Sequence, residues 1–164
     1  MGQQIFYVIT TTEIEIPIDI IHFKEKNSII LPLLIEDNDY IYKMIESSVH
    51  TKNVRDFLEY AIWQFHYEYP TRKVFDFIFR NEIKTFGLIG YREILDIPQN
   101  LDGAMLFIND VRIEFESTED IESKIHKKLD ADFTFVELIN NEQKYWSFES
   151  AEKCYFNKLE RNYR

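Results

Sequence analysis

The chain has 164 residues, of which 29 are acidic and 19 basic, so its formal net charge is -10 and its pI is near 4.9. This acidity argues against generic nucleic-acid binding, which rests on Lys and Arg contacts to phosphates, and against membrane attachment through polybasic segments. Hydrophobic residues make up 45% of the chain and aromatic residues 16%. That composition excludes a disordered chain and predicts one domain, residues 1–164, with a substantial core.

The cellular location is predicted from what the sequence lacks. Cys154 is the only cysteine, so the disulfides of a small secreted protein are not expected. The first residues show neither the basic region nor the small-residue cleavage site of a signal peptide. The longest apolar runs, such as residues 29–35, are far shorter than the ~20 residues that a membrane helix needs. We therefore expect a cytoplasmic protein without a membrane segment.

The N-terminal third is predicted to be mostly strand. In residues 12–23, Glu13 and Glu15 alternate with Ile14 and Ile16, the period of a half-buried strand. Pro17 would place this strand at an edge or a bend. The elements expected here are strands at residues 5–10, 12–23 and 28–35, followed by a short helix at residues 39–49 that Asp39 caps.

The middle of the chain contains the clearest helix, predicted over residues 52–67. Its apolar residues follow one another at helical spacing and form a single stripe: Val54, Phe57, Leu58, Ala61, Ile62 and Phe65. Residues 73–79 are rich in Phe and Val and are predicted to be a strand. Residues 81–95 are ambiguous, because Gly87 and Gly90 weaken an otherwise helical pattern.

The C-terminal half is predicted to alternate hairpins and helices. Residues 104–108 and 111–116 would pair around a tight turn at Asn109 and Asp110, which tolerate positive φ. Ser117 would cap a helix over residues 118–129. Residues 133–138 and 144–148 suggest a second hairpin, and Ser150 would cap a terminal helix. The predicted fold class is α+β, with a mainly antiparallel sheet of about eight strands and three or four helices.

No recognisable catalytic motif is present, and we predict no enzyme, no cofactor and no metal site. The chain contains no P-loop, nucleophile elbow or dinucleotide fingerprint. Its four histidines lie in separate segments without the spacing of zinc ligands. Asp132, Glu142 and Lys144 could form the magnesium site of a nuclease, but Glu142 falls in an expected turn and a solvated turn is the favoured explanation of these residues.

The negative charge is concentrated in one segment. Between residues 93 and 122 there is one base, Arg112, and nine acids: Glu93, Asp96, Asp102, Asp110, Glu114, Glu116, Glu119, Asp120 and Glu122. A solubilising surface is one explanation. The other is a face for a basic partner, since complementary charge raises association rates and suppresses wrong partners. Glu36, Asp37 and Asp39 form a second candidate patch.

A second candidate surface is aromatic. Tyr60, Trp63 and Tyr67 are spaced i, i+3 and i+7 on the long helix, nearly opposite its apolar stripe. A helix with apolar residues on both faces is either packed between two layers, which is the commoner case, or shows one face to a partner. If exposed, this face would have the composition of an interface hot spot.

In its size, acidity, aromatic content and lack of catalytic motifs, the chain resembles the bacterial immunity proteins that neutralise colicin-like or contact-dependent inhibition toxins. The resemblance is one of class and assigns no role to any residue. It implies an inhibitor that covers a basic toxin, such as a nuclease domain, without itself binding nucleic acid. The alternatives are a small metal-dependent nuclease or hydrolase using Asp132, Glu142 and Lys144, or a structural subunit that self-associates through Tyr60, Trp63 and Tyr67.

Overall fold

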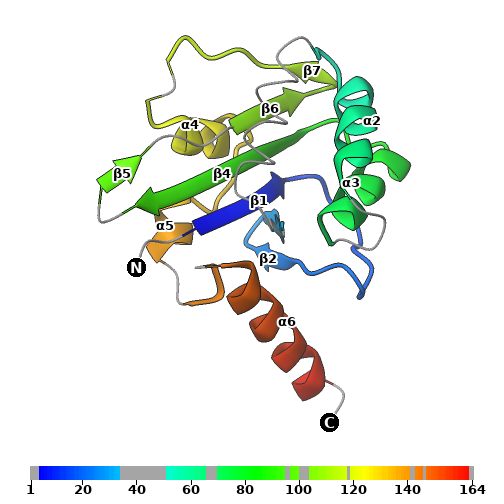
Figure 1. Ribbon diagram of the computed structural model, residues 1–164, viewed down its shortest axis with the longest axis vertical. Helices are drawn as coiled ribbons and strands as arrows, with labels where there is room; N and C mark the ends of the chain where they lie inside the picture. Colours follow the sequence, from blue (N-terminus) through cyan, green and yellow to red (C-terminus); the bar gives the residue numbers. More distant parts are fainter. Residues whose placement is uncertain are drawn as a thin grey trace.

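A computed structural model describes residues 4–33, 51–65, 70–94, 97–99, 104–117, 119–140, 143–145 and 147–162. These residues form one antiparallel sheet of seven strands in the order β2-β3-β1-β4-β6-β7, with β5 pairing with β4 (Figure 1). The strands are β1 (Gln4–Thr10), β2 (Phe23–Glu25), β3 (Ser28–Pro32), β4 (Phe86–Ile94), β5 (Ile97–Gln99), β6 (Ala104–Ile108) and β7 (Val111–Arg112). The predicted α+β class and mainly antiparallel sheet are confirmed. The predicted numbers, about eight strands and three or four helices, differ from the seven strands and five α-helices of the described residues.

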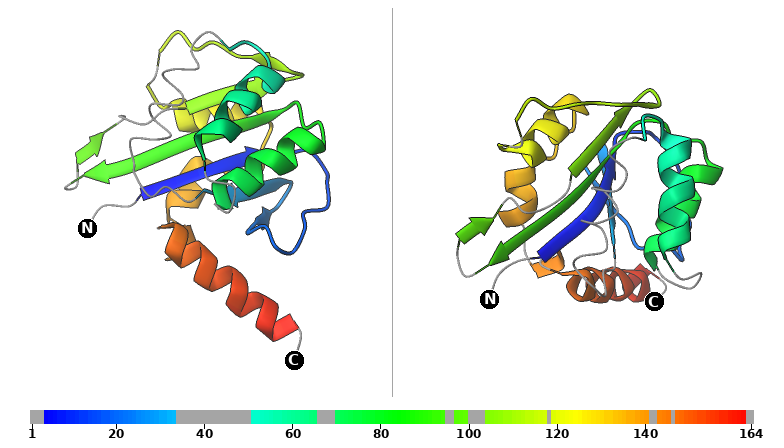
Figure 2. Two further views of the ribbon diagram at one scale, coloured as in Figure 1. Left: turned by 45° about the vertical axis from the view of Figure 1, so that its right-hand side comes forward. Right: turned by 45° about the horizontal axis from the view of Figure 1, so that its top comes forward.

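Helices cover both faces of the sheet. Those described are α2 (Val54–Gln64), α3 (Pro70–Arg80), α4 (Ile121–Lys128), α5 (Phe135–Asn140) and α6 (Phe148–Asn162), with a 3-10 turn, η1 (Gln143–Tyr145). Figure 2 shows α2 and α3 together on one side, with α4 and α5 on the other. Within the described ranges, no helix is long and apolar enough to cross a membrane.

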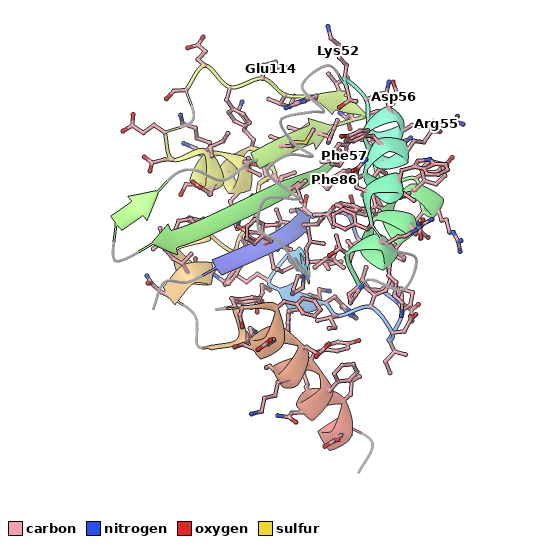
Figure 3. All side chains as sticks on the ribbon, in the orientation of Figure 1. Lys52, Arg55, Asp56, Phe57, Phe86 and Glu114 are labelled. Carbon is pink, nitrogen blue, oxygen red and sulfur yellow. The ribbon has the colours of Figure 1, made fainter. Side chains whose placement is uncertain are left out.

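Strand alternation divides the core into two layers. In β1, Phe6 and Val8 point toward α2 and α3, whereas Tyr7 and Ile9 point toward α4, α5 and α6. Figure 3 shows Phe57 of α2 beside Phe86 of the sheet, where both contribute to the first layer. The two layers explain the high aromatic content, because each sheet face needs its own set of large side chains.

The second layer depends on a close approach between α4 and the sheet. A Cβ atom placed on Gly87 of β4 would lie 2.5 Å from Cγ2 of Ile125 in α4. Only glycine leaves room for the isoleucine at that point. Gly87, which weakened the case for a helix in the sequence, is therefore a packing site within a strand.

The start of α2 is joined to the β7 edge of the sheet. The Val54 N–H donates to Oδ1 of Asp110 over 3.0 Å, and the Arg112 N–H donates to the Lys52 carbonyl over 2.9 Å. Asn53 forms a β-bridge with Val111 and caps α2 through the Asp56 N–H. These contacts fix α2 against the connection that follows β7.

Several predicted elements are confirmed, and others are wrong. β1 matches residues 5–10, α2 lies within 52–67, and the turn at Asn109 and Asp110 has the expected positive φ values of 50° and 74°. Residues 81–95 contain β4. The strand predicted at residues 12–23 is absent apart from Phe23, because Pro17 begins a turn that the Ile20 N–H closes. The helix predicted at 39–49 lies outside the described residues.

Residues 73–79 belong to a helix, α3, and not to a strand. Thr71, Val74, Phe75 and Ile78 are buried, at the helical spacing i, i+3, i+4 and i+7. The Phe-rich composition favoured a strand, but burial of one helical stripe against α2 and the sheet decides the structure.

The second predicted hairpin, residues 133–138 with 144–148, is replaced by α5, η1 and the start of α6. Thr134 and Glu137 form a capping box, in which the Glu137 N–H donates to Thr134 Oγ1 over 3.0 Å. Ser150 was the expected cap of the terminal helix, but Ser147 Oγ accepts from the Ser150 N–H and takes that place.

The helix predicted at 118–129 is α4, which begins at Ile121. The strand predicted at 111–116 is limited to β7.

Candidate protein-binding site

The candidate site is the connection between β7 and α4, residues 113–120, which we call the acidic connection. Four carboxylates project from it into solvent: Glu114, Glu116, Glu119 and Asp120. None of them takes part in any ion pair formed among the described residues, whereas Glu25, Glu59, Asp76, Asp110 and Glu137 do. The acidic connection therefore carries four carboxylates that are not ion-paired with any other described residue.

The acidic connection is held in place by its apolar residues. Ile113 and Phe115 pack against the second core layer, while Glu114 and Glu116 between and after them face outward. The Ile113 N–H donates to the Leu106 carbonyl over 2.8 Å, which continues the pairing of the sheet beyond β7. The alternation that predicted a strand thus still orients the side chains, although the strand itself ends at Arg112.

Basic groups lie on one side of the acidic connection. Lys124 of α4 donates to the Ser117 carbonyl over 3.4 Å, and Lys128 stands 6.0 Å from the centre of the Phe115 ring. Burial lowers the pKa of the half-buried Arg112, and the charge of Glu114 raises it. These groups offset part of the charge on the side toward α4, so the carboxylates dominate the outward side.

Two acids expected in this patch have other positions. Asp110 caps α2 and lies 3.9 Å from Nζ of Lys84, so its carboxylate is used within the fold. Glu122 is buried, with 4% of its surface exposed, and its desolvation raises the pKa of the carboxyl group. Glu122 is thus a correction to the prediction, because a buried carboxyl group cannot form part of an exposed acidic face.

The remaining predicted residues are described only in part. Tyr60 is half-buried and packs against the first core layer, while Trp63 is 86% exposed at the end of α2. The preferred prediction, that this aromatic face is packed between two layers, is therefore wrong for Trp63. Outside the described residues lie Glu36, Asp37, Asp39, Tyr67, Asp96 and Asp102, together with the side chain of Glu93.

The second core layer contains a buried polar pair that sequence reasoning missed. The ring of His126 donates from Nδ1 to the Phe133 carbonyl over 2.6 Å, so Nε2 of the neutral ring accepts from the Tyr7 hydroxyl over 2.8 Å. Burial lowers the pKa of His126 and raises that of Tyr7. Glu122, Ile125, His126 and Leu129 are spaced i, i+3, i+4 and i+7. This helical stripe could have predicted that the side chains of Glu122 and His126 are buried.

Of the three residues of the alternative nuclease site, the structure describes Asp132 and Lys144. Lys144 donates to Glu25 Oε1 over 2.5 Å and lies 4.8 Å from the centre of the Phe23 ring. Asp132 is exposed, and its backbone N–H donates to Asn27. Glu142 lies outside the described residues. Among the residues that are described, no group of three or more His, Cys, Asp or Glu could hold a metal ion.

Comparisons with protein-family models, with curated proteins and with solved structures found no match. The function is therefore inferred from the geometry of the chain itself. Its outstanding surface features are the acidic connection and an exposed tryptophan, and both are suited to binding another protein.

Proposed function

We propose that this protein is an immunity or inhibitor protein that binds and neutralises a basic protein toxin, such as a nuclease domain, by covering it. The observation that carries the proposal is the set of four exposed carboxylates on the acidic connection, none of which is ion-paired with another described residue. Like charges on one short segment repel one another, and a basic surface reduces that repulsion on binding. The same charge attracts the partner over a distance and speeds association.

The exposed end of α2 supports the same proposal. Trp63 exposes 86% of its surface, and Asp56 and Glu59 are exposed on the same helix. A tryptophan provides a large rigid contact and is enriched among the residues that dominate binding energy. Because α2 begins at the bridge between Asn53 and Val111, its position relative to the acidic connection is fixed before a partner arrives.

The first experiment is affinity capture of the partner from the native host, followed by its identification and purification. We expect a basic protein with a toxic activity that this chain suppresses. Capture of an acidic protein, or of a basic one whose activity is unchanged in the complex, would contradict the proposal.

The second experiment measures the association rate of that purified partner across a range of salt concentrations. The test variant is Glu114→Gln/Glu116→Gln/Glu119→Gln/Asp120→Asn. The matched control removes four exposed acids elsewhere: Glu13→Gln/Glu15→Gln/Glu152→Gln/Glu160→Gln. Only the test variant should associate roughly tenfold more slowly with a weaker salt dependence. Equal behaviour of the two variants would exclude the acidic connection from the interface.

The two alternative functions have their own measurements. Calorimetric titration with magnesium or manganese would reveal the metal site that a nuclease or hydrolase using Asp132, Glu142 and Lys144 requires. Sedimentation would detect a subunit that self-associates through Trp63. We expect no heat of metal binding and a monomeric mass.

A further inference from the structure

The last helix, α6, is attached to the domain by a narrow apolar stripe. Of the α6 side chains that the structure describes, Ala151 and Tyr155 are buried, and more than half are exposed. Phe148, Cys154 and Leu159 are half-buried against the second core layer. A cleft of about 150 Å3 lies between one side of α6 and the start of α3. Figure 1 shows α6 extending away from the sheet, past β2, so its position depends strongly on the contacts near its start.

The residues just before α6 hold an ammonium group between two aromatic rings and a carboxylate. Nζ of Lys144, in η1, lies 4.8 Å from the centre of the Phe23 ring and 4.9 Å from the centre of the Tyr145 ring. It also donates to Oε1 of Glu25 over 2.5 Å. Proteins recognise ligand ammonium groups with the same combination of groups. We call Phe23, Glu25 and Tyr145 the ammonium cage, and Lys144 occupies it from within the chain.

The ion pair in the ammonium cage is more shielded than another pair on the same hairpin. The side chains of Lys144 and Glu25 are 24% and 17% exposed, whereas those of Lys26 and Glu137 are 58% and 44% exposed. The Tyr145 hydroxyl also donates to Oε1 of Glu25 over 2.5 Å. Burial and the carboxylate of Glu25 raise the pKa of Tyr145, so this hydroxyl stays a donor. A shielded carboxylate with two donors contributes more than an exposed pair.

The ammonium cage joins the start of α6 to the last strand of the sheet. Phe23 and Glu25 are the first and last residues of β2, a three-residue strand at the end of the strand order. Tyr145 packs edge-on against Phe23, with ring centres 5.6 Å apart. Further along α6, the Tyr155 hydroxyl donates to the carbonyl of Ile18, shortly before β2, over 2.7 Å. Short outer elements open at a lower free energy than central strands such as β1 and β4.

We propose that the ammonium cage is a latch, with Lys144 as its internal ligand, and that opening the latch releases η1 and α6 from an otherwise folded domain. Release uncovers Tyr145, Ala151 and Tyr155, which are buried while the latch is closed. Loss of the Lys144 charge opens the latch, because it removes both the ion pair and the attraction to the rings. The device does not depend on the proposed toxin partner.

The test is amide hydrogen exchange of the purified chain, measured peptide by peptide. In the wild type, amides of α6 should exchange at least about tenfold faster than those of β1 and β4. Lys144→Met keeps the apolar stem and should accelerate exchange in α6 by roughly a further tenfold, with β1 and β4 unchanged. The matched control, Lys26→Met, breaks the exposed pair with Glu137 and should change exchange in α6 by less than about twofold.

Equal exchange in α6 and β1 of the wild type would overturn the release of the helix. Wild-type exchange of α6 in Lys144→Met, or an equal acceleration in Lys26→Met, would overturn the latch. Thermal unfolding verifies that each variant is folded. Tyr145→Phe keeps both rings and removes one hydrogen bond to Glu25, so it tests the latch even if Lys144→Met does not fold. It should accelerate exchange in α6 by about threefold, and an unchanged rate would contradict the role of Glu25.

Chemical rescue tests whether Lys144 acts as a ligand of the ammonium cage. Lys144→Ala removes the atoms that propylammonium supplies, so added propylammonium chloride should slow exchange in α6 of this variant by about threefold. Sodium chloride at equal ionic strength and propanol at equal concentration should not slow it. Equal effects of the three additives would show that the ammonium cage does not recognise an ammonium group.

Discussion

At the scale of single residues, the buried polar side chains of Tyr7, Glu122 and His126 differ in their hydrogen bonding. Tyr7 and His126 are hydrogen-bonded to each other, because the Tyr7 hydroxyl donates to Nε2 of His126. The Nδ1–H of His126 donates to the Phe133 carbonyl. Glu122 is also buried, and its carboxyl group accepts from its own backbone N–H. The hydrogen-bonded pair of Tyr7 and His126 stabilises the fold, whereas burial destabilises the ionised form of Glu122.

Replacing Glu122 by Gln should stabilise the protein at pH 7. Burial raises the pKa of this carboxyl group, so the folded state favours the protonated form, and its contribution to stability is lost as pH rises through that pKa. Glutamine keeps the shape and removes the charge. Urea unfolding should give a higher free energy of unfolding for Glu122→Gln at pH 7. The control Glu119→Gln, at an exposed position, should differ from wild type by less than about 0.5 kcal/mol.

His126 should make the protein less stable under mild acid. Its pKa is lowered in the folded state, so below the unfolded-state pKa of about 6.5 the unfolded chain binds more protons and stability falls as pH decreases. The measurement is urea unfolding from pH 7.5 to 5.5 in the Glu122→Gln background, which removes the opposing effect of that carboxyl group. Adding His126→Gln should flatten the dependence. A slope that persists unchanged would assign it to another histidine.

At the scale of elements, the sequence predicts best where one local pattern decides. The stripe of α2 and the positive-φ turn at Asn109 and Asp110 depend only on nearby residues, and both are observed. The capping box at Thr134 and Glu137 was equally local and would have identified α5. In contrast, the Val54 N–H at the start of α2 donates to Asp110, 56 residues away along the chain, and no sequence pattern predicts such a contact.

The contact between β4 and α4 gives a prediction at this scale. A methyl group on Gly87 would meet Ile125 Cγ2 at 2.5 Å, so Gly87→Ala should destabilise the fold by about 1–3 kcal/mol. Ile125→Ala alone should cost about 2–5 kcal/mol, because it leaves a cavity. Combined, the two changes should cost less than their sum, since the shorter side chain makes room for the methyl group. Additive unfolding energies would indicate that the helix moves instead.

At the scale of the whole molecule, the distribution of charge differs from what its count suggested. Of the nine acids in residues 93–122, the structure describes six side chains: Asp110 accepts from the first N–H of α2, Glu122 is buried, and four carboxylates are exposed. The sequence located the charge but could not show which acids are exposed, which are buried and which are hydrogen-bonded within the fold. These differences depend on how β7, α2 and α4 pack together. It also did not indicate that Arg55 of α2 would line one cavity with Arg80 and Lys84, at and beyond the end of α3.

The exposed tryptophan separates binding from stability. Because Trp63 is 86% exposed, Trp63→Ser should change the free energy of unfolding by less than about 0.5 kcal/mol. If the end of α2 contacts the partner, the same change should weaken binding by more than 1 kcal/mol, or roughly fivefold. Urea unfolding and calorimetry with the captured partner measure the two effects. A loss of stability without a loss of affinity would assign Trp63 to the fold.

The bonds between residues 52–53 and β7 also determine how a partner can bind here. Both edges of β7 are occupied, one by β6 and the other by the start of α2 through the Arg112 N–H and the bridge at Val111. A partner therefore cannot extend the sheet at this end by adding a strand, the mode in which backbone hydrogen bonds tolerate many sequences. A partner of the proposed kind would have to recognise this end of the sheet through side chains, so single changes on its surface would be enough to alter binding.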